Sequence, residues 1–123
     1  MPVSATDELT DSLNQQIQQL YETHLGHHPS KITCQSFEGK LAILLEGALT
    51  QPEQLLYSQG QTDLVRQIRD GLHEILRPRM KTLIQETMGV RVIDLLTATQ
   101  LDTGRVSFMA VLGNASSPYS NGR

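Results

Sequence analysis

Arginine side chains recur along the polar side of one segment and are the strongest candidates for chemistry in this sequence. A guanidinium group offers a planar fork of N–H donors that suits a carboxylate, a phosphate or bicarbonate. The sequence therefore predicts an anion site near Pro78, where a kink would open a polar hollow. Its residues are Arg66, Arg69, Arg77 and Arg79. The alternative is a solvated face on which these arginines have only Asp70 and Glu74 as local partners.

Three histidines lie close together at the end of the first expected helix and are the weak candidates for a metal site. They are His24, His27 and His28. Three imidazoles within a turn could hold zinc or nickel, or respond to pH near 6.5. However, Gly26 ends the helix between them, and no cysteine or carboxylate follows at ligand spacing. We therefore expect no metal and no cofactor, and we expect His73 to be a surface residue of the long helix.

The remaining reactive groups do not combine into a catalytic set. Cys34 lies on an expected strand beside Ile32, where a small thiol is typical of a core, and it has no basic neighbour that would activate it. No carboxylates are paired by spacing for acid–base work, and no glycine-rich phosphate loop occurs. The sequence therefore predicts that the protein is not an enzyme.

A long amphipathic helix from Gly60 to Gly89 positions the arginines. Asp63 suits the positive end of its dipole, and Gly89 can adopt the left-handed conformation at its end. Pro78 lacks the N–H that would bond to the Glu74 carbonyl, so we expect it to kink the helix or split it. Apolar residues at steps of three and four predict the side that faces the core. They are Leu64, Ile68, Leu72, Ile75, Leu76, Met80, Leu83 and Ile84.

The rest of the chain predicts two more helices and two hairpins around this helix. The segments are helix 7–25, strands 31–37 and 40–49, helix 52–57, and strands 90–99 and 105–112. Thr50 and Glu53 form a capping box before the short helix, and Glu38-Gly39 is a two-residue hairpin turn. The fold is expected to be α+β, in the order α-β-β-α-α-β-β. It is a two-layer sandwich with helices on one face of a four-stranded antiparallel sheet.

Length and composition predict one soluble domain over residues 7–112, with a disordered lead at 1–6 and a flexible tail at 113–123. No stretch approaches the roughly 20 apolar residues of a membrane span, and no signal peptide is visible. A single cysteine excludes an internal disulfide and fits a reducing cytosol. The net charge of −3 and the scarcity of aromatic residues argue against a nucleic-acid binder.

Two stretches, LEGALTQPEQLL and DLVRQIRDGLHEILRPRMKTLIQETMGV, resemble the MpsC-like family of short bacterial and archaeal proteins. The features in common with that family are a strand that ends in G-x-L-T-x-x-E-x-x-L and an arginine-rich helix with R-P at its middle. The resemblance covers roughly Asp7 to Leu112. It implies a small accessory or regulatory protein of a sodium-translocating, membrane-potential-generating system. The membrane partners of that system are connected with bicarbonate or CO2 uptake.

Two functions from different classes follow from these observations. The first is a cytoplasmic accessory module with a membrane transporter as partner and bicarbonate or a related anion as ligand. We expect it to be a homodimer that associates through the apolar stripe of the first helix and the exposed side of the long helix. The alternative is an RNA-binding α+β module, although the sequence lacks the G-x-x-G loop of a KH domain.

Overall fold

The computed structural model describes residues 5–115 of the 123-residue chain and, within them, the side chains of residues 8–114. Residues 5–6 of the predicted lead belong to α1 and residues 113–115 of the predicted tail belong to β4, which corrects both bounds; the rest of the lead and tail lies outside the described residues. The elements are α1 (Ala5–Leu25), β1 (Lys31–Phe37), β2 (Lys40–Glu46), α2 (Gln51–Ser58), α3 (Thr62–Met88), β3 (Val90–Gln100) and β4 (Arg105–Ala115). Their order, α-β-β-α-α-β-β, is the predicted one. None of the described helices has the length and apolar character that a membrane span requires.

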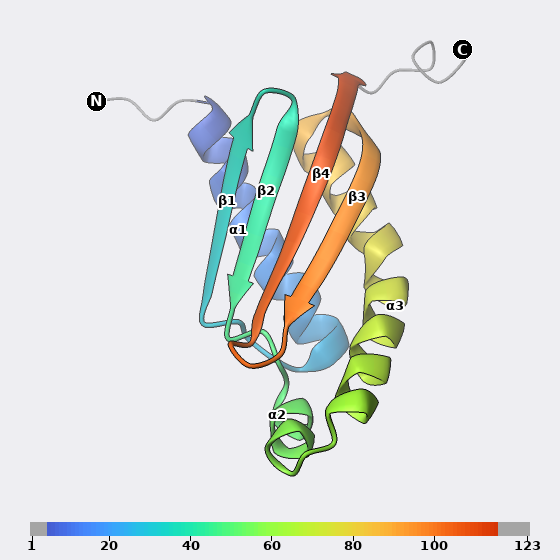
Figure 1. The fold of residues 1–123 in the computed structure, drawn as a ribbon. Helices are drawn as coiled ribbons and strands as arrows, with labels where there is room; N and C mark the ends of the chain where they lie inside the picture. The colour runs from blue at the N-terminus through green and yellow to red at the C-terminus, as the bar shows by residue number, and fades with distance from the viewer. Residues whose placement is uncertain (1–4, 116–123) are drawn as a thin grey trace.

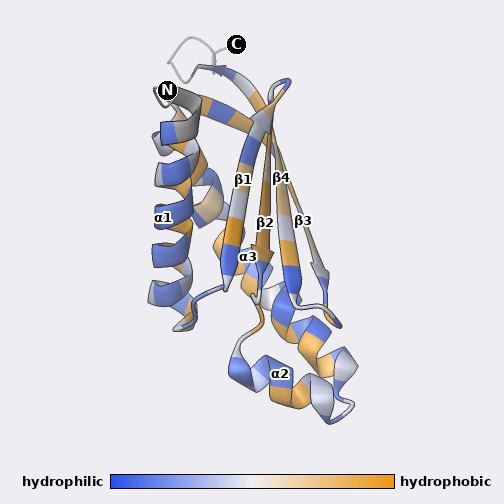
Figure 2. Ribbon diagram, turned by 90° about the vertical axis from the view of Figure 1, so that its left-hand side faces the viewer, coloured by the Kyte–Doolittle hydropathy of each residue, from blue (hydrophilic) through white to orange (hydrophobic). Residues whose placement is uncertain are grey.

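The four strands form one antiparallel sheet in the order β1-β2-β4-β3 (Figure 1). Two hairpins supply the strands, and the second strand of each lies in the centre of the sheet. In the apolar run of β2, Leu41, Ile43 and Leu45 are buried, whereas Ala42 and Leu44 are partly exposed on the other face. Figure 2 shows α1 and α3 on one side of the sheet and no helix on the other side. The predicted two-layer architecture is therefore confirmed.

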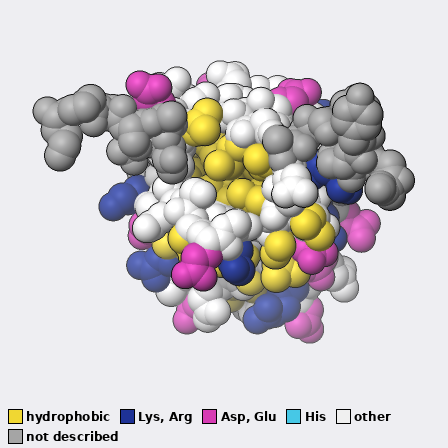
Figure 3. All heavy atoms as spheres, turned by 90° about the horizontal axis from the view of Figure 1, so that it is seen from above, with side chains coloured by type: hydrophobic (Ala, Val, Ile, Leu, Met, Phe, Trp, Pro, Cys, Tyr) yellow, Lys and Arg dark blue, Asp and Glu magenta, His cyan; other side chains and the backbone are white. Residues whose placement is uncertain are grey.

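The core lies between the helices and the face of the sheet that they cover. Alternate strand residues point into it because side chains in a strand alternate between faces. The buried strand residues are Ile32, Leu41, Ile43, Leu45, Val92, Val106, Phe108 and Ala110. Figure 3 looks onto the end that carries the β1–β2 turn, where hydrophobic side chains gather in the middle and charged ones surround them.

The apolar stripe of α1 packs into this core. Leu13, Ile17 and Tyr21 are completely buried, and Leu20 and Leu25 pack against the same cluster. The expectation that this stripe would mediate self-association is therefore wrong. A stripe that already covers a sheet has no surface left for a second chain.

Helix α3 is continuous from Thr62 to Met88 and includes Pro78, so the chain does not split there. Its buried residues are Val65, Arg69, His73, Leu76, Met80 and Ile84. The predicted stripe is correct in the second half of the helix and only partly correct in the first half, where Ile68 and Leu72 are partly buried. There Leu64 and Ile75 are 43% and 58% exposed, while Val65 is completely buried. The first half is therefore rotated by one residue relative to the predicted orientation.

Local signals at the ends of the elements are confirmed. Thr50 and Glu53 form the predicted capping box, and Gly89 closes α3 in the left-handed conformation with φ of 68°. Gly47 ends β2 with φ of 62°, and a Cβ on it would lie 2.6 Å from Ser30 Oγ. Only glycine fits there without strain. The resulting bend directs the chain out of the sheet toward α2.

Candidate functional site

A buried ion pair at Arg69 is the most heavily connected polar group of the described residues. Arg69 and Glu53 are each 2% exposed. Arg69 Nε donates to Glu53 Oε2 at 2.6 Å, and Nη2 donates to Glu53 Oε1 and to the Ala48 carbonyl, both at 2.8 Å. Nη1 donates to the Tyr21 hydroxyl at 3.4 Å. One guanidinium thus joins α1, the end of β2, α2 and α3.

The charges of this pair are held by hydrogen bonds and by each other. Burial alone would raise the pKa of Glu53, but hydrogen bonds from Arg69 and Thr50 outweigh burial and leave the pKa below its usual value. Thr50 supplies both its backbone N–H and its hydroxyl, each 2.9 Å from Glu53 Oε1. Burial raises the pKa of Tyr21, so its phenol stays protonated. The arrangement therefore engages all three nitrogens of the Arg69 guanidinium with partners inside the protein.

The four arginines of the predicted anion site do not lie together. Arg69 is internal, which corrects the prediction that it belongs to the exposed polar side of the helix. At 100° per residue, Arg66 and Arg77 share one flank of α3, whereas Arg79 falls on the opposite flank. Arg66 and Arg77 line hollows beside β3, and Arg79 lines a groove beside α1. The fold therefore separates Arg79 from the other three arginines.

A polar cleft between α3 and β3 is lined by three of these arginines, the exposed Arg66 and Arg77 and the buried Arg69. Two adjoining hollows of about 220 and 570 Å³ share Asp70, with Arg66 at one end and Arg77 at the other. Thr97 and Thr99 of β3 form the opposite wall. Eleven residues separate Arg66 from Arg77, which is about 16 Å along a helix. A small anion in this cleft therefore meets one of these two arginines directly and the second only if both side chains extend.

His73 lies in the wall of this cleft and is buried, which corrects the expectation of a surface residue. Its Nε2 lies 3.3 Å from the Thr99 hydroxyl, and its ring meets Phe108 edge to face. Burial lowers the pKa of His73, and the nearby positive charges of Arg69 and Arg77 lower it further. The imidazole is therefore neutral at pH 7, suited to a neutral hydrogen bond and not to holding an anion by charge.

The three histidines near the end of α1 do not share a partner. His27 Nε2 donates to the Gly47 carbonyl at 2.7 Å, and His28 Nε2 lies 3.3 Å from Glu22 Oε2. His24 is exposed on the last turn of α1. Across residues 8–114, no three His, Cys, Asp or Glu side chains are grouped so that they could hold a metal ion. Loop geometry, and not ligation, therefore accounts for the contacts of His27.

Cys34 faces the covered side of the sheet, as predicted from its place on β1. It is a free thiol of intermediate exposure that packs against the core. Burial raises the pKa of the Cys34 thiol to about 11. The thiolate is the nucleophilic form of cysteine, so at neutral pH this side chain is unreactive.

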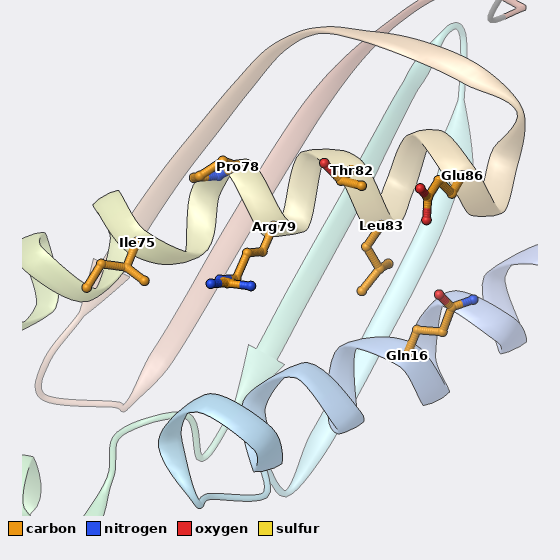
Figure 4. Close-up of a pocket in the computed structure, with 7 residues that line it drawn as sticks. All are labelled: Gln16, Ile75, Pro78, Arg79, Thr82, Leu83 and Glu86. Carbon is orange, nitrogen blue, oxygen red and sulfur yellow. The ribbon is translucent and has the colours of Figure 1, made fainter.

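An open groove of about 630 Å³ runs between α1 and α3 (Figure 4). The apolar part of its lining is Ile75, Pro78 and Leu83 from α3. Arg79 points into the space between the helices, and Glu86 lies two turns further along. Neither charge has an ion-pair partner among the described residues. The sequence singled out Arg79 as a candidate binding residue. It did not indicate that Gln16 of α1 forms the opposite wall, which only the fold shows.

The chain matches the family model described as Na+-translocating membrane potential-generating system (MpsC) over residues 5–114. No curated protein and no solved structure matches the chain.

Proposed function

The chain belongs to the MpsC family, and from this premise we propose that it is a non-enzymatic accessory or regulatory protein of a sodium-translocating, membrane-potential-generating system. In this proposal it works in the cytoplasm and docks on a membrane transporter. The absence of an enzymatic role is supported by the protonated thiol of Cys34, because the thiolate is the form of cysteine that would serve as a nucleophile.

The observation that carries this proposal is the α1–α3 groove. A pair of packed helices with an apolar floor between them is a common receptor for an amphipathic segment of another protein. Ile75 is 58% exposed at one end, so the groove offers apolar surface that nothing in the described chain covers. Leu83 continues this floor toward the core.

The charges of the groove define the chemistry of the segment that fits it. Arg79 and Glu86 are seven residues apart, about 10 Å along the helix, and have opposite signs. A segment of the transporter that places apolar side chains on the groove floor therefore needs an acidic residue near Arg79 and a basic residue near Glu86. Such complementarity fixes the direction in which the segment lies.

Reversing the charge of Arg79 tests this docking in cells that carry the transport system and lack their own copy of this protein. We expect wild-type protein to restore a Na+-dependent membrane potential, measured with a voltage-sensitive dye. Arg79→Glu should fail, because truncating or reversing one side of a buried charge pair costs about 2–5 kcal/mol, or about 30-fold or more in affinity. Lys81→Glu is the matched control, since Lys81 is exposed on the same helix but outside the groove.

The outcomes separate the parts of the proposal. If Arg79→Glu restores the potential as well as wild type does, the groove is not the docking site. If deleting the gene leaves the Na+-dependent potential unchanged, the accessory role itself is wrong. If Lys81→Glu also fails, the loss reflects the net charge of the helix and contradicts the groove.

Bicarbonate or a related small anion is the ligand of this proposal, and the α3–β3 cleft supports it. Arg77 is exposed there, has no ion-pair partner among the described residues, and lines the same hollow as Thr97. Asp70 and Glu74 share the same hollow and oppose an anion by charge. The balance of the two signs implies weak binding, on the order of millimolar.

Isothermal titration with bicarbonate tests this ligand directly. We expect saturable heat with the wild-type protein at millimolar concentration and a loss of that heat in Arg77→Ala, because the exposed guanidinium supplies the positive charge. Lys81→Ala, which removes a charge outside the cleft, should bind as wild type does. Flat heats for the wild-type protein would remove the anion from the proposal and leave the docking role standing.

The RNA-binding alternative has less support. Sheet-based RNA binders stack bases on aromatic side chains of an open sheet face. The open face of this sheet carries one aromatic side chain among the described residues, Phe37.

A further inference from the structure

No helix covers one face of the sheet (Figure 2), and the residues at the centre of that face are largely apolar. Residues of β1 to β4 that alternate with the buried ones point to this face. Leu96 of β3 is 60% exposed there, and Ile93 is 56% exposed beside the backbone of Gly113. A bulge in β3 between Val92 and Asp94 accounts for the extra residue at this edge. An uncovered sheet face of this kind marks an interaction surface.

The strand register arranges this face in four rows across β1, β2, β4 and β3. The first row is Phe37, Lys40, Val111 and Asp94, and the second is Gln35, Ala42, Met109 and Leu96. The third row is Thr33, Leu44, Ser107 and Ala98, and the fourth is Lys31, Glu46, Arg105 and Gln100. The two middle rows carry no charge. The charged side chains are confined to the two outer rows.

We propose that this open face binds the same face of a second copy of the chain, which makes a two-fold dimer by packing sheet on sheet. The inference does not depend on the proposed function, because the groove lies on the other side of the sheet. It replaces the helix surfaces of the sequence-based expectation with a different surface. Two sheets that pack face to face interdigitate their inner side chains across about 10 Å.

The pattern of rows is self-complementary. A two-fold axis in the interface and perpendicular to the strands sets each strand against its own copy, with the rows reversed. Ala42 then faces Leu44 of the second copy, and Met109 faces Ser107, so that a large side chain meets a small one. In the outer rows, Lys40 faces Glu46 of the second copy, and the symmetry repeats this contact. The middle rows therefore match in shape, and the outer rows match in charge at Lys40 and Glu46.

The size of the face is that of a small stable interface. Four strands about 4.8 Å apart and four rows about 6.7 Å apart cover roughly 500 Å². Two copies would bury on the order of 1,000 Å², the lower limit for a specific interface. The apolar middle rows and the polar outer rows follow the usual division of an interface into core and rim.

Placing a charge in the middle rows tests the dimer. We expect sedimentation equilibrium of the wild-type chain at about 100 μM to give twice the 13.7 kDa monomer mass. Leu96→Glu should weaken association by about a hundredfold or more, because the symmetry buries two unpaired carboxylates. Leu55→Glu is the matched control. Leu55 is 63% exposed on α2, close to the exposure of Leu96, but it lies away from the sheet face.

A second variant distinguishes dissociation of the dimer from unfolding of the monomer. Ala98→Glu lies one row from Leu96 at an exposed position, so the monomer should tolerate it, and its circular dichroism should match wild type. A monomeric wild-type chain overturns the proposal. A dimer that survives both Leu96→Glu and Ala98→Glu also overturns it and points to pairing at the edge strands β1 or β3. Dissociation by Leu55→Glu alone would assign the contact to α2.

Discussion

Replacing Arg69 with methionine is expected to lower the free energy of unfolding by about 3–5 kcal/mol, because the substitution leaves the Glu53 carboxylate buried without its counter-charge. Glu53 is 2% exposed and cannot recover this loss from water without opening α2. The Ala48 carbonyl and the Tyr21 hydroxyl would lose a donor at the same time. Urea denaturation followed by circular dichroism measures the change.

Two further variants establish that the ion pair is the cause. Arg66→Met makes the same substitution one turn earlier, at an exposed position, and should change the stability by no more than about 0.5 kcal/mol. Glu53→Gln combined with Arg69→Met removes both charges and keeps an acceptor for Thr50. This double variant should be more stable than Arg69→Met alone. Equal losses in Arg66→Met and Arg69→Met would contradict the structural role of the pair.

The same pair gives the stability a defined dependence on acidity. The pKa of Glu53 in the folded chain lies below its ordinary value of 4.5. The carboxylate therefore contributes fully above pH 4.5, and the contribution disappears as pH falls through the lower, folded pKa. Glu53→Gln should lose this part of the acid dependence, and wild type should keep it.

Val65→Asp is expected to destabilise the protein by about 3–5 kcal/mol, whereas Leu64→Asp should cost about 1 kcal/mol or less. Val65 is completely buried against Leu49 and Leu101, so a carboxylate there has no water and no partner. Leu64 is 43% exposed on the adjacent flank of the helix. Thermal denaturation of the two variants, side by side with wild type, gives the comparison.

This pair of variants distinguishes the two possible orientations of α3. Periodicity alone places Leu64 in the core and leaves Val65 beside the polar side. A larger loss in Leu64→Asp than in Val65→Asp would therefore restore the sequence-based orientation and contradict the rotation. Equal losses would mean that the first turns of α3 are buried on both flanks.

Local signals in the sequence were sufficient for the elements and their order. The capping box of Thr50 and Glu53, the glycine at position 89 and the turn at Glu38-Gly39 depend only on nearby backbone geometry. The alternation of Val106, Phe108 and Ala110 depends only on the period of a strand. Such signals are local, so they could be interpreted correctly without any knowledge of the fold. The family was also recognisable from the sequence, over nearly the span that its model matches.

These local signals did not determine which face of α3 is buried. Two series on this helix have the same spacing, one beginning at Leu64 and the other at Val65, and they differ by 100°. The first is wholly apolar in its first turns, whereas the second contains Arg69 and His73. Hydrophobicity therefore favoured the first series, and with it an exposed Arg69. No local pattern indicates that a buried arginine will find a partner.

The sequence by itself determined the secondary structure, the α+β class, the antiparallel hairpins and the family of this protein. Only the tertiary structure decided which face of α3 is buried, because that choice depends on Glu53 and Ala48 meeting Arg69 and on Thr99 meeting His73. These partners come from segments 16 to 26 residues away in the chain. A buried polar side chain is stable only when such partners are in place, and their convergence is a property of the folded chain.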